Sequence, residues 1–213
     1  MKLTIIDTKA GNFSSIINGF KKIGCEIDLT QDKDSIKKAQ ALVIPGVSSF
    51  YRGMKGLNDA NLINLVKSQI INIKVPTIGI CLGMQLLAKT STEGSKGSNK
   101  IDGLGILDAN IIRLLPKTSD YRVPNIGWYD VYPEKESISF PKKRAIENFY
   151  HVHSYHMICN DPKDVAGTIN YGDEKIVVSI EKDNIFGCQF HPEKSQDAGL
   201  DLLNRFVKKI KSA

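Results

Sequence analysis

Cys81 lies in a segment whose residue types suit nucleophilic chemistry. The segment Gly79-Ile80-Cys81-Leu82-Gly83 has the form Gly-x-nucleophile-x-Gly, in which the glycines permit a tight turn that exposes the central side chain. The residues before it predict a strand and those after it predict a helix, so Cys81 would stand at a helix N-terminus. The positive end of the helix dipole favours the reactive thiolate there. A buried structural cysteine in a glycine-rich turn is the alternative interpretation.

A thiol nucleophile requires a base, and Phe190-His191-Pro192-Glu193 supplies a histidine and a carboxylate on one short loop. The imidazole can take the thiol proton and return it to a departing group, while the carboxylate fixes the tautomer and stabilises the imidazolium. Because a free thiol is only slightly ionised at neutral pH, a paired histidine matters. The His-x-Glu spacing occurs often by chance, so its meaning depends on the combination with Cys81.

A second cluster of histidines raises the question of a metal site. His151 and His153 alternate by two residues and would share one face of a strand, with His156 and Cys159 shortly after them. Two faces of a strand plus a turn do not make a tetrahedral cage. The chain also contains no Cys-x-x-Cys pair. We therefore expect no metal and no other cofactor.

The elements that must position these residues alternate between strands and helices in the first half of the chain. Short apolar runs predict buried strands at residues 3–7, 26–29, 41–44 and 76–80. Apolar residues at helical spacing predict helices at residues 13–20, 62–70 and 81–88. Asn12 is placed to cap the first helix and Gly24 to terminate it. This alternation implies a parallel sheet covered by helices.

Beyond Gly94 the pattern becomes β-rich. Strand-like segments occur at residues 111–115, 165–169, 176–180 and 185–188. A last helix is predicted over residues 199–211, with Leu200, Leu203, Val207 and Ile210 facing inward, and residues 93–102 predict a surface loop. Neither an internal repeat nor a linker divides the chain. We expect a single domain over residues 1–213, of the α/β class, with a mostly parallel central sheet and an additional β-rich second half.

The composition sets the class of protein and of partner. The chain has 213 residues, 41% of them hydrophobic, and could bury one sizeable core. We expect a cytoplasmic protein without membrane contact, because the sequence contains neither a membrane-spanning apolar stretch nor a signal peptide. The net charge is +6 and the pI about 9.0, yet lysine pairs recur without interleaved aromatics and predict a solvated surface. We expect no nucleic-acid partner. A basic face that binds an acidic protein partner is the alternative interpretation of the charge.

The two reactive segments carry a resemblance to a known family. Residues 79–85 and 189–195, which read GICLGMQ and QFHPEKS, resemble the two signature segments of class I glutamine amidotransferases. Residues 45–47, 123–128 and 150–155 resemble, more narrowly, the glutaminase subunits of imidazole glycerol phosphate synthases. The likeness runs in order over nearly the whole chain. It implies the flavodoxin-like fold of that family.

The resemblance also implies roles for the residues at matching positions. The catalytic triad would be Cys81, His191 and Glu193. Backbone amides around an oxyanion hole would come from Gly46, Val47 and Leu82. The pocket for L-glutamine would be lined by Gln85, Glu93, Ser154 and Tyr155. By residue type alone Trp128 would belong to the core, whereas the resemblance places it at a partner interface, together with Asn12 and Lys194.

In the family, glutamine is hydrolysed to glutamate and the ammonia passes along a sealed path into a separate (β/α)₈ synthase subunit. The resemblance therefore implies a heterodimer that makes imidazole glycerol phosphate and AICAR in histidine biosynthesis. A paralogue that supplies ammonia to a surface-sugar amidotransferase is the near alternative. A non-catalytic protein of this fold, or a peptidase or deglycase of the superfamily, is disfavoured by the intact triad, by the His-x-Glu spacing and by Gln85.

Several positions depart from the subfamily pattern. Residues 7–12 read Asp-Thr-Lys-Ala-Gly-Asn, where Asp-Tyr-Gly-x-Gly-Asn is usual, so Thr8 and Lys9 differ. Ser48 stands where glycine is usual, Asn125 where histidine is usual, and Tyr129 where asparagine is usual. None of these is a triad residue. They lie in segments that approach the oxyanion turn and the synthase in the family, so they bear on the identity of the partner more than on the hydrolysis.

Overall fold

The computed structural model describes residues 1–95, 99–117, 120–141 and 146–212. Five neighbouring strands, in the order β2-β1-β3-β4-β13, run parallel. They are β1 (Lys2–Ile6), β2 (Glu26–Thr30), β3 (Leu42–Ile44), β4 (Thr77–Ile80) and β13 (Ile185–Cys188). Because the carboxyl ends of parallel strands lie at one edge of a sheet, the residues that follow β3, β4 and β13 meet there.

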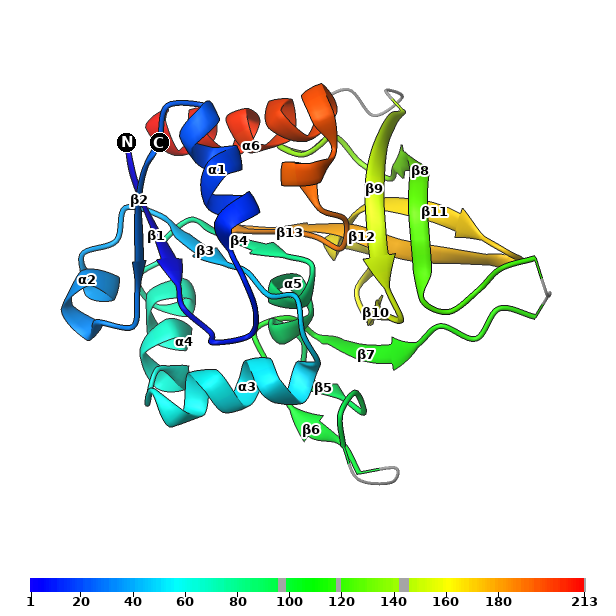
Figure 1. The fold of residues 1–213 in the computed structure, drawn as a ribbon, viewed down its shortest axis with the longest axis horizontal. Helices are drawn as coiled ribbons and strands as arrows, with labels where there is room; N and C mark the ends of the chain where they lie inside the picture. Colours follow the sequence, from blue (N-terminus) through cyan, green and yellow to red (C-terminus); the bar gives the residue numbers. More distant parts are fainter. Residues whose placement is uncertain (96–98, 118–119, 142–145, 213) are drawn as a thin grey trace.

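Helices cover both faces of this parallel part (Figure 1). One face carries α1 (Ser14–Lys22) and α6 (Gln196–Lys211), and the opposite face carries α3 (Phe50–Asp59), α4 (Ile63–Ile71) and α5 (Leu82–Leu86), with α2 (Lys33–Lys37) beside α4. Each face has its own apolar core, because alternate residues of a strand point to opposite sides. Thus Val43 joins the core under α1 and α6, while Leu42 and Ile44 join the other.

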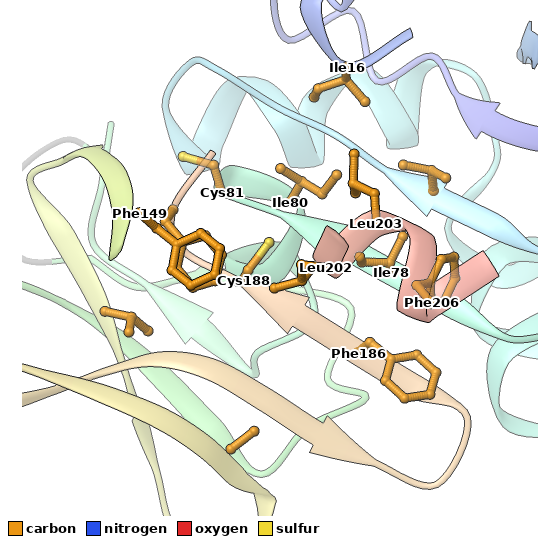
Figure 2. Close-up of a cluster of buried hydrophobic side chains, with 14 of the residues drawn as sticks. Ile16, Ile78, Ile80, Cys81, Phe149, Phe186, Cys188, Leu202, Leu203 and Phe206 are labelled. Carbon is orange, nitrogen blue, oxygen red and sulfur yellow. The ribbon is translucent and has the colours of Figure 1, made fainter. Parts of the chain in front are cut away.

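The core under α6 joins segments that are far apart in the sequence. Leu203 and Phe206 of α6 lie over Ile78 of β4 and Phe186 of β13 (Figure 2). These side chains come from three elements, of which β4 is far from the other two in sequence, and they are buried together. Among the described residues, no helix is long and apolar enough to cross a membrane.

The second half of the chain extends the sheet and makes it mixed. Its strands are β5 (Thr90–Ser91), β6 (Ile101–Asp102), β7 (Ala109–Arg113), β8 (Asn125–Pro133), β9 (Glu147–His153), β10 (Tyr155–Cys159), β11 (Val165–Tyr171) and β12 (Glu174–Lys182), with 3₁₀ turns η1 (Pro162–Asp164) and η2 (Pro192–Lys194). The antiparallel pair β8-β9 joins the sheet through β11. Ser154 alone separates β9 from β10, so the chain passes from the hairpin into the main sheet at that residue.

The predicted α/β fold class, with its mostly parallel sheet in the first half and β-rich second half, is confirmed. The segments predicted as strands in the first half correspond to β1–β4, and Gly24 follows α1 with a positive φ of 80°. Helix α3 was not predicted, because Gly53 and Gly56 lower its helix propensity. Their missing side chains allow close packing instead: a Cβ on Gly56 would lie 1.9 Å from the Thr8 carbonyl oxygen.

Two predictions about local structure were wrong in part. The last helix begins at Gln196, and Leu202 and Phe206 fill its buried face while Leu200 is only half-buried. The buried stripe differs because this face of the helix lies over both Ile78 and Phe186. The predicted surface loop at residues 93–102 begins at a half-buried Glu93 and ends in strand β6. Its residues 96–98 lie outside the described residues.

The close approach of α5 to β3 gives a test of the fold. A Cβ on Gly83 would lie 1.6 Å from the Ile44 carbonyl oxygen, which is backbone held in the sheet. We expect Gly83→Ala to lower the free energy of unfolding by roughly 3 kcal/mol or more, as overpacking against fixed atoms does. Gly19→Ala is the matched control, because the nearest atom to its added Cβ belongs to a side chain at 3.1 Å. Denaturant melts that showed equal losses would contradict this packing.

Candidate active site

Cys81 occupies the turn between β4 and α5 with a backbone that few residues adopt. Its φ of 53° and ψ of −111° are strained for a residue with a side chain. The strain is held by neighbouring strands, because the Cys81 N–H donates to the Cys188 carbonyl at the end of β13 at 2.7 Å. The turn directs the side chain out of the sheet and into a cavity. The strand-to-helix context predicted for Gly79-Ile80-Cys81-Leu82-Gly83 is present.

His191 and Glu193 follow β13, the strand beside β4. The His191 Nδ1 and Glu193 Oε1 atoms are 2.8 Å apart, and the two side chains are only 1% and 2% exposed. Ser195 fixes this segment, since its hydroxyl donates to the His191 carbonyl and accepts from the Tyr150 N–H. The histidine is therefore oriented by a buried carboxylate, as a general base requires.

The protonation of His191 depends on its burial and on two neighbouring groups. Burial by itself lowers the pKa of this imidazole, but the interactions with Cys81 and with the Glu193 carboxylate raise the pKa to about 10. The imidazole therefore carries its second proton at neutral pH. Such a proton is available to a leaving group on the substrate.

A cavity at this edge brings most of the predicted site residues together. Cys81 and His191 lie in its wall, and Glu193 lies behind His191. The other predicted residues in the wall are Val47, Leu82, Gln85, Glu93, Ser154, Tyr155 and Lys194. Sequence analysis did not single out Pro124 and Val152, which also line it. The cavity has the mixed polar and apolar wall of a small-molecule site.

The turn after β3 was predicted to supply oxyanion-hole amides. The Val47 N–H donates to the Ala10 carbonyl at 3.0 Å, so in this conformation it does not point at Cys81. Gly46 packs so closely on Leu82 that a Cβ would lie 2.7 Å from the leucine side chain. Leu82 opens α5, and the first N–H groups of a helix have no partner within the helix. The Leu82 amide therefore stays a predicted donor, while the Val47 amide is engaged by Ala10 in this conformation.

Glu93 lines the cavity and also contacts the beginning of α3. Its Oε2 accepts the Phe50 N–H at 2.8 Å, at the beginning of α3. Burial raises the pKa of this carboxyl group, and the hydrogen bond from Phe50 opposes that shift. Glu93 therefore closes the N-terminus of α3 as well as lining the cavity.

Gln189 is a site residue that sequence reasoning missed, although it lies in one of the two signature segments. It is fully buried, and its Nε2 donates to the Cys81 sulfur at 3.6 Å. Its Oε1 accepts from Gln85 Nε2 at 2.8 Å. Its position two residues before His191, directly after the strand-like segment 185–188, was the available signal, because alternate residues of an extended chain share a face.

The histidines of β9 form a neutral buried pair beside the cavity. His151 Nδ1 and His153 Nε2 are 3.4 Å apart, and Asn125 Nδ2 lies 3.2 Å from the same His153 nitrogen. Burial lowers the pKa of His153 to about 4 and that of His151 well below its usual value. Within the described residues, no group of three metal-binding side chains surrounds these histidines.

The three predicted interface residues lie outside the cavity or at its mouth. Asn12 is exposed, and its Oδ1 accepts the N–H of Ser14, the first residue of α1, at 2.8 Å. The N-cap of α1 is Phe13, which makes no side-chain cap hydrogen bond, so the predicted capping by Asn12 was wrong by one residue. Trp128 is 45% exposed on the outer face of β8, next to Tyr150, and so does not belong to the core. Lys194 is exposed beside the triad. Ile126, 58% exposed, extends the apolar surface on β8.

Comparison with known proteins places this geometry in a family. A model of the family described as "Glutamine amidotransferase class-I" matches residues 4–210. The chain belongs to the class I glutamine amidotransferase family. Solved structures share the fold: one described as a glutamine amidotransferase has a TM-score of 0.73 at 18% identity, covering 99% of each chain. The structure of PurLQS from Thermotoga maritima has a TM-score of 0.71 at 15% identity, covering 98% of each chain.

Within this class I amidotransferase family, relatives of known name match along their whole length. The imidazole glycerol phosphate synthase subunit HisH 2 of Methanococcus maripaludis is 39% identical, over 97% of this chain and 98% of its own. The subunit HisH 2 of Pseudomonas aeruginosa is 35% identical, over 98% and 100%. The subunit HisH of one Prochlorococcus marinus strain is 37% identical, over 99% and 96%.

The amidotransferase site makes a prediction about pH. Glu193→Gln removes a charge that raises the pKa of His191, so this pKa should fall and the imidazolium should be lost at lower pH. The alkaline limb of glutaminase activity should move to lower pH, while His191→Ala should abolish activity nearly as completely as loss of the thiol. Rate profiles for the three proteins check this. Identical profiles for Glu193→Gln and wild type would remove Glu193 from the mechanism.

Proposed function

We propose that the chain hydrolyses L-glutamine with Cys81 as nucleophile, His191 as proton carrier and Glu193 as the residue that orients it. The observation that carries this proposal is the strained Cys81 turn facing a buried His191–Glu193 pair across one cavity. The sulfur attacks the side-chain amide of glutamine and a tetrahedral oxyanion forms. His191 gives its proton to the leaving ammonia, and water then hydrolyses the γ-glutamyl thioester to glutamate.

The substrate would lie between α5, the Glu93 segment and the corner after β9. Gln85 and Glu93 offer an amide and a carboxylate to the cavity, and Ser154 and Tyr155 offer the irregular backbone between β9 and β10. A glutamine molecule has an ammonium, a carboxylate and an amide to satisfy. Polar groups of both kinds at one wall suit such a ligand.

The chain is proposed to act as the glutaminase subunit of an imidazole glycerol phosphate synthase, in a heterodimer with a (β/α)₈ subunit. Support comes from relatives that carry this subunit name and match over nearly their whole length. An exposed apolar strip formed by Ile126 and Trp128, with Lys194 at the cavity mouth, offers a surface for such a partner. Lys194 is placed to pair with a carboxylate on it. Direct transfer would keep ammonia from being protonated and lost.

The oxyanion turn supports regulation by the partner. The Val47 N–H is engaged by Ala10, which lies in the same loop as the exposed Asn12. One peptide flip could redirect an amide of this turn toward Cys81. A single oxyanion-hole donor is worth roughly 3 kcal/mol, or about a hundredfold in rate. The isolated chain should therefore hydrolyse glutamine poorly until a partner alters the loop.

A surface-sugar amidotransferase remains the second candidate partner, motivated by the departures from the subfamily pattern. Three of them have partners inside this molecule. Thr8 is buried and donates to the Pro45 carbonyl, Asn125 is buried against His153, and Tyr129 packs edge-on against His151. These substitutions affect internal packing, so they bear less on the partner than sequence analysis inferred. The other two departures differ from these. Lys9 is exposed and pairs with Asp7, and Ser48 lies in the cavity wall.

Removal of the nucleophile separates the two reactions. We expect Cys81→Ala to fold normally and to lose glutamine-dependent synthesis in the complex, while the synthase still works with added ammonium salt. The reason is that the mutation removes only the ammonia source. The measurement is product formation with each nitrogen donor. Glutaminase activity retained by Cys81→Ala in the complex would refute the proposed mechanism.

The partner can be identified by stimulation. We expect glutamate release to rise by about a hundredfold when the chain is mixed with the (β/α)₈ subunit of an imidazole glycerol phosphate synthase together with the ligand of that enzyme. A sugar-amidine synthase with its own substrate is the matched comparison. Stimulation by the sugar enzyme alone would reassign the partner and leave the triad intact. Full activity of the isolated chain, unchanged by either partner, would refute the gating.

A further inference from the structure

The Cys81 sulfur has a second polar neighbour besides the catalytic histidine. Gln189 Nε2 lies 3.6 Å from the sulfur, within the range of a hydrogen bond to sulfur. The Gln189 side chain is fully buried directly after β13. Within the described residues, the Cys81 sulfur is the hydrogen-bond acceptor of Gln189 Nε2.

The orientation of the Gln189 amide is fixed by a chain of hydrogen bonds. The chain begins at the Tyr155 carbonyl oxygen, which can only accept, so Gln85 must present its Nε2 there, at 3.2 Å. The same Nε2 donates its other hydrogen to Gln189 Oε1 at 2.8 Å. Gln189 must then turn its own nitrogen toward Cys81. A flip of either amide would set two groups of the same kind, both donors or both acceptors, against each other.

This orientation matters because a hydrogen-bond donor distinguishes the two forms of the sulfur. A thiolate is a better acceptor than a thiol, and a donor that is already in place favours the charged form. Gln189 is held by Gln85 and by burial, so little reorganisation is needed when the charge forms. An acceptor in the same position would oppose the thiolate.

We propose that Gln189 is a further catalytic residue, which stabilises the Cys81 thiolate by donating a hydrogen bond, and that Gln85 acts as the positioning residue that sets its direction. This inference rests on the proposed function, because it assumes that Cys81 is the nucleophile. It adds a donor to the sulfur that does not belong to the triad.

The arrangement also links the cavity to the sulfur. Both hydrogens of Gln85 Nε2 are directed inward, to Tyr155 and Gln189, which leaves Gln85 Oε1 as the acceptor on a side chain that lines the cavity. A substrate N–H bound there polarises the Gln85 amide, and hydrogen bonds in a chain strengthen one another. Occupation of the cavity therefore reinforces the donor on the sulfur.

The test is the rate of Cys81 alkylation by iodoacetamide as a function of pH, measured on the full chain by mass spectrometry of the Cys81 peptide. Gln189→Met keeps the length of the side chain and removes the donor. We expect alkylation near neutral pH to slow by roughly three- to tenfold, and its midpoint to move to higher pH. Gln189→Glu, which brings an acceptor to the sulfur, should slow it further.

Gln69→Met is the matched control, because Gln69 is also a buried glutamine but lies in α4, on the opposite face of the sheet from α6. Its alkylation profile should equal that of wild type. Thermal melts of all variants show which of them fold. If Gln189→Glu does not fold, Gln189→Met alone decides whether Gln189 donates to the sulfur. A Gln189→Met profile that coincides with those of wild type and Gln69→Met would overturn the inference.

Glu193→Gln separates this inference from the triad itself. If Glu193→Gln shifts the alkylation profile and Gln189→Met does not, the triad stands and the role of Gln189 is refuted. If the alkylation profiles of Glu193→Gln and wild type coincide, the His191–Glu193 pair does not control the Cys81 sulfur. The proposed function then fails, and this inference fails with it. In the complex, Gln189→Met should lower kcat for glutamine hydrolysis with little change in KM.

Discussion

The parallel pairing of β4 with β13 is the interaction on which the site depends. It joins Thr77–Ile80 to Ile185–Cys188 in register, and the Cys81 N–H continues the ladder to the Cys188 carbonyl. Because parallel strands end at the same edge, the nucleophile turn and the His191 segment emerge side by side although they are far apart in sequence. The same pairing restrains the positive φ of Cys81. A site assembled in this way requires the complete sheet, including its last strand.

Several elements meet at that edge, and each brings a different part of the proposed chemistry. The strand β3 leads into the proposed oxyanion turn, β4 into the proposed nucleophile Cys81, and β13 into the proposed base His191. The corner between β9 and β10 brings the Tyr155 carbonyl, which orients Gln85 and through it Gln189. A backbone acceptor that belongs to the β-rich half therefore determines which atom faces a sulfur in the parallel half.

The Val47 turn differs from the rest of the site in that its amide is engaged elsewhere. Its hydrogen bond to Ala10 ties the turn to the loop before α1, and Asn12 of that loop also accepts the first amide of the helix. A surface that contacts this loop can act on the Val47 turn without touching Cys81. The internal contacts of Thr8, Asn125 and Tyr129 show that residues which depart from the subfamily pattern can serve the packing of the chain itself.

The sequence by itself determined the fold class, the order of strands and helices in the first half and the choice of Cys81, His191 and Glu193 as candidates, because these depend on local periodicity and on short motifs. It did not predict α3, whose glycines reduce helix propensity while one of them, Gly56, allows close packing on the Thr8 backbone. It did not single out Gln189, or the withdrawn state of the Val47 amide, because both depend on partners distant in sequence. Only the tertiary structure decides these features, since the orientation of an amide follows from the atoms that packing places around it.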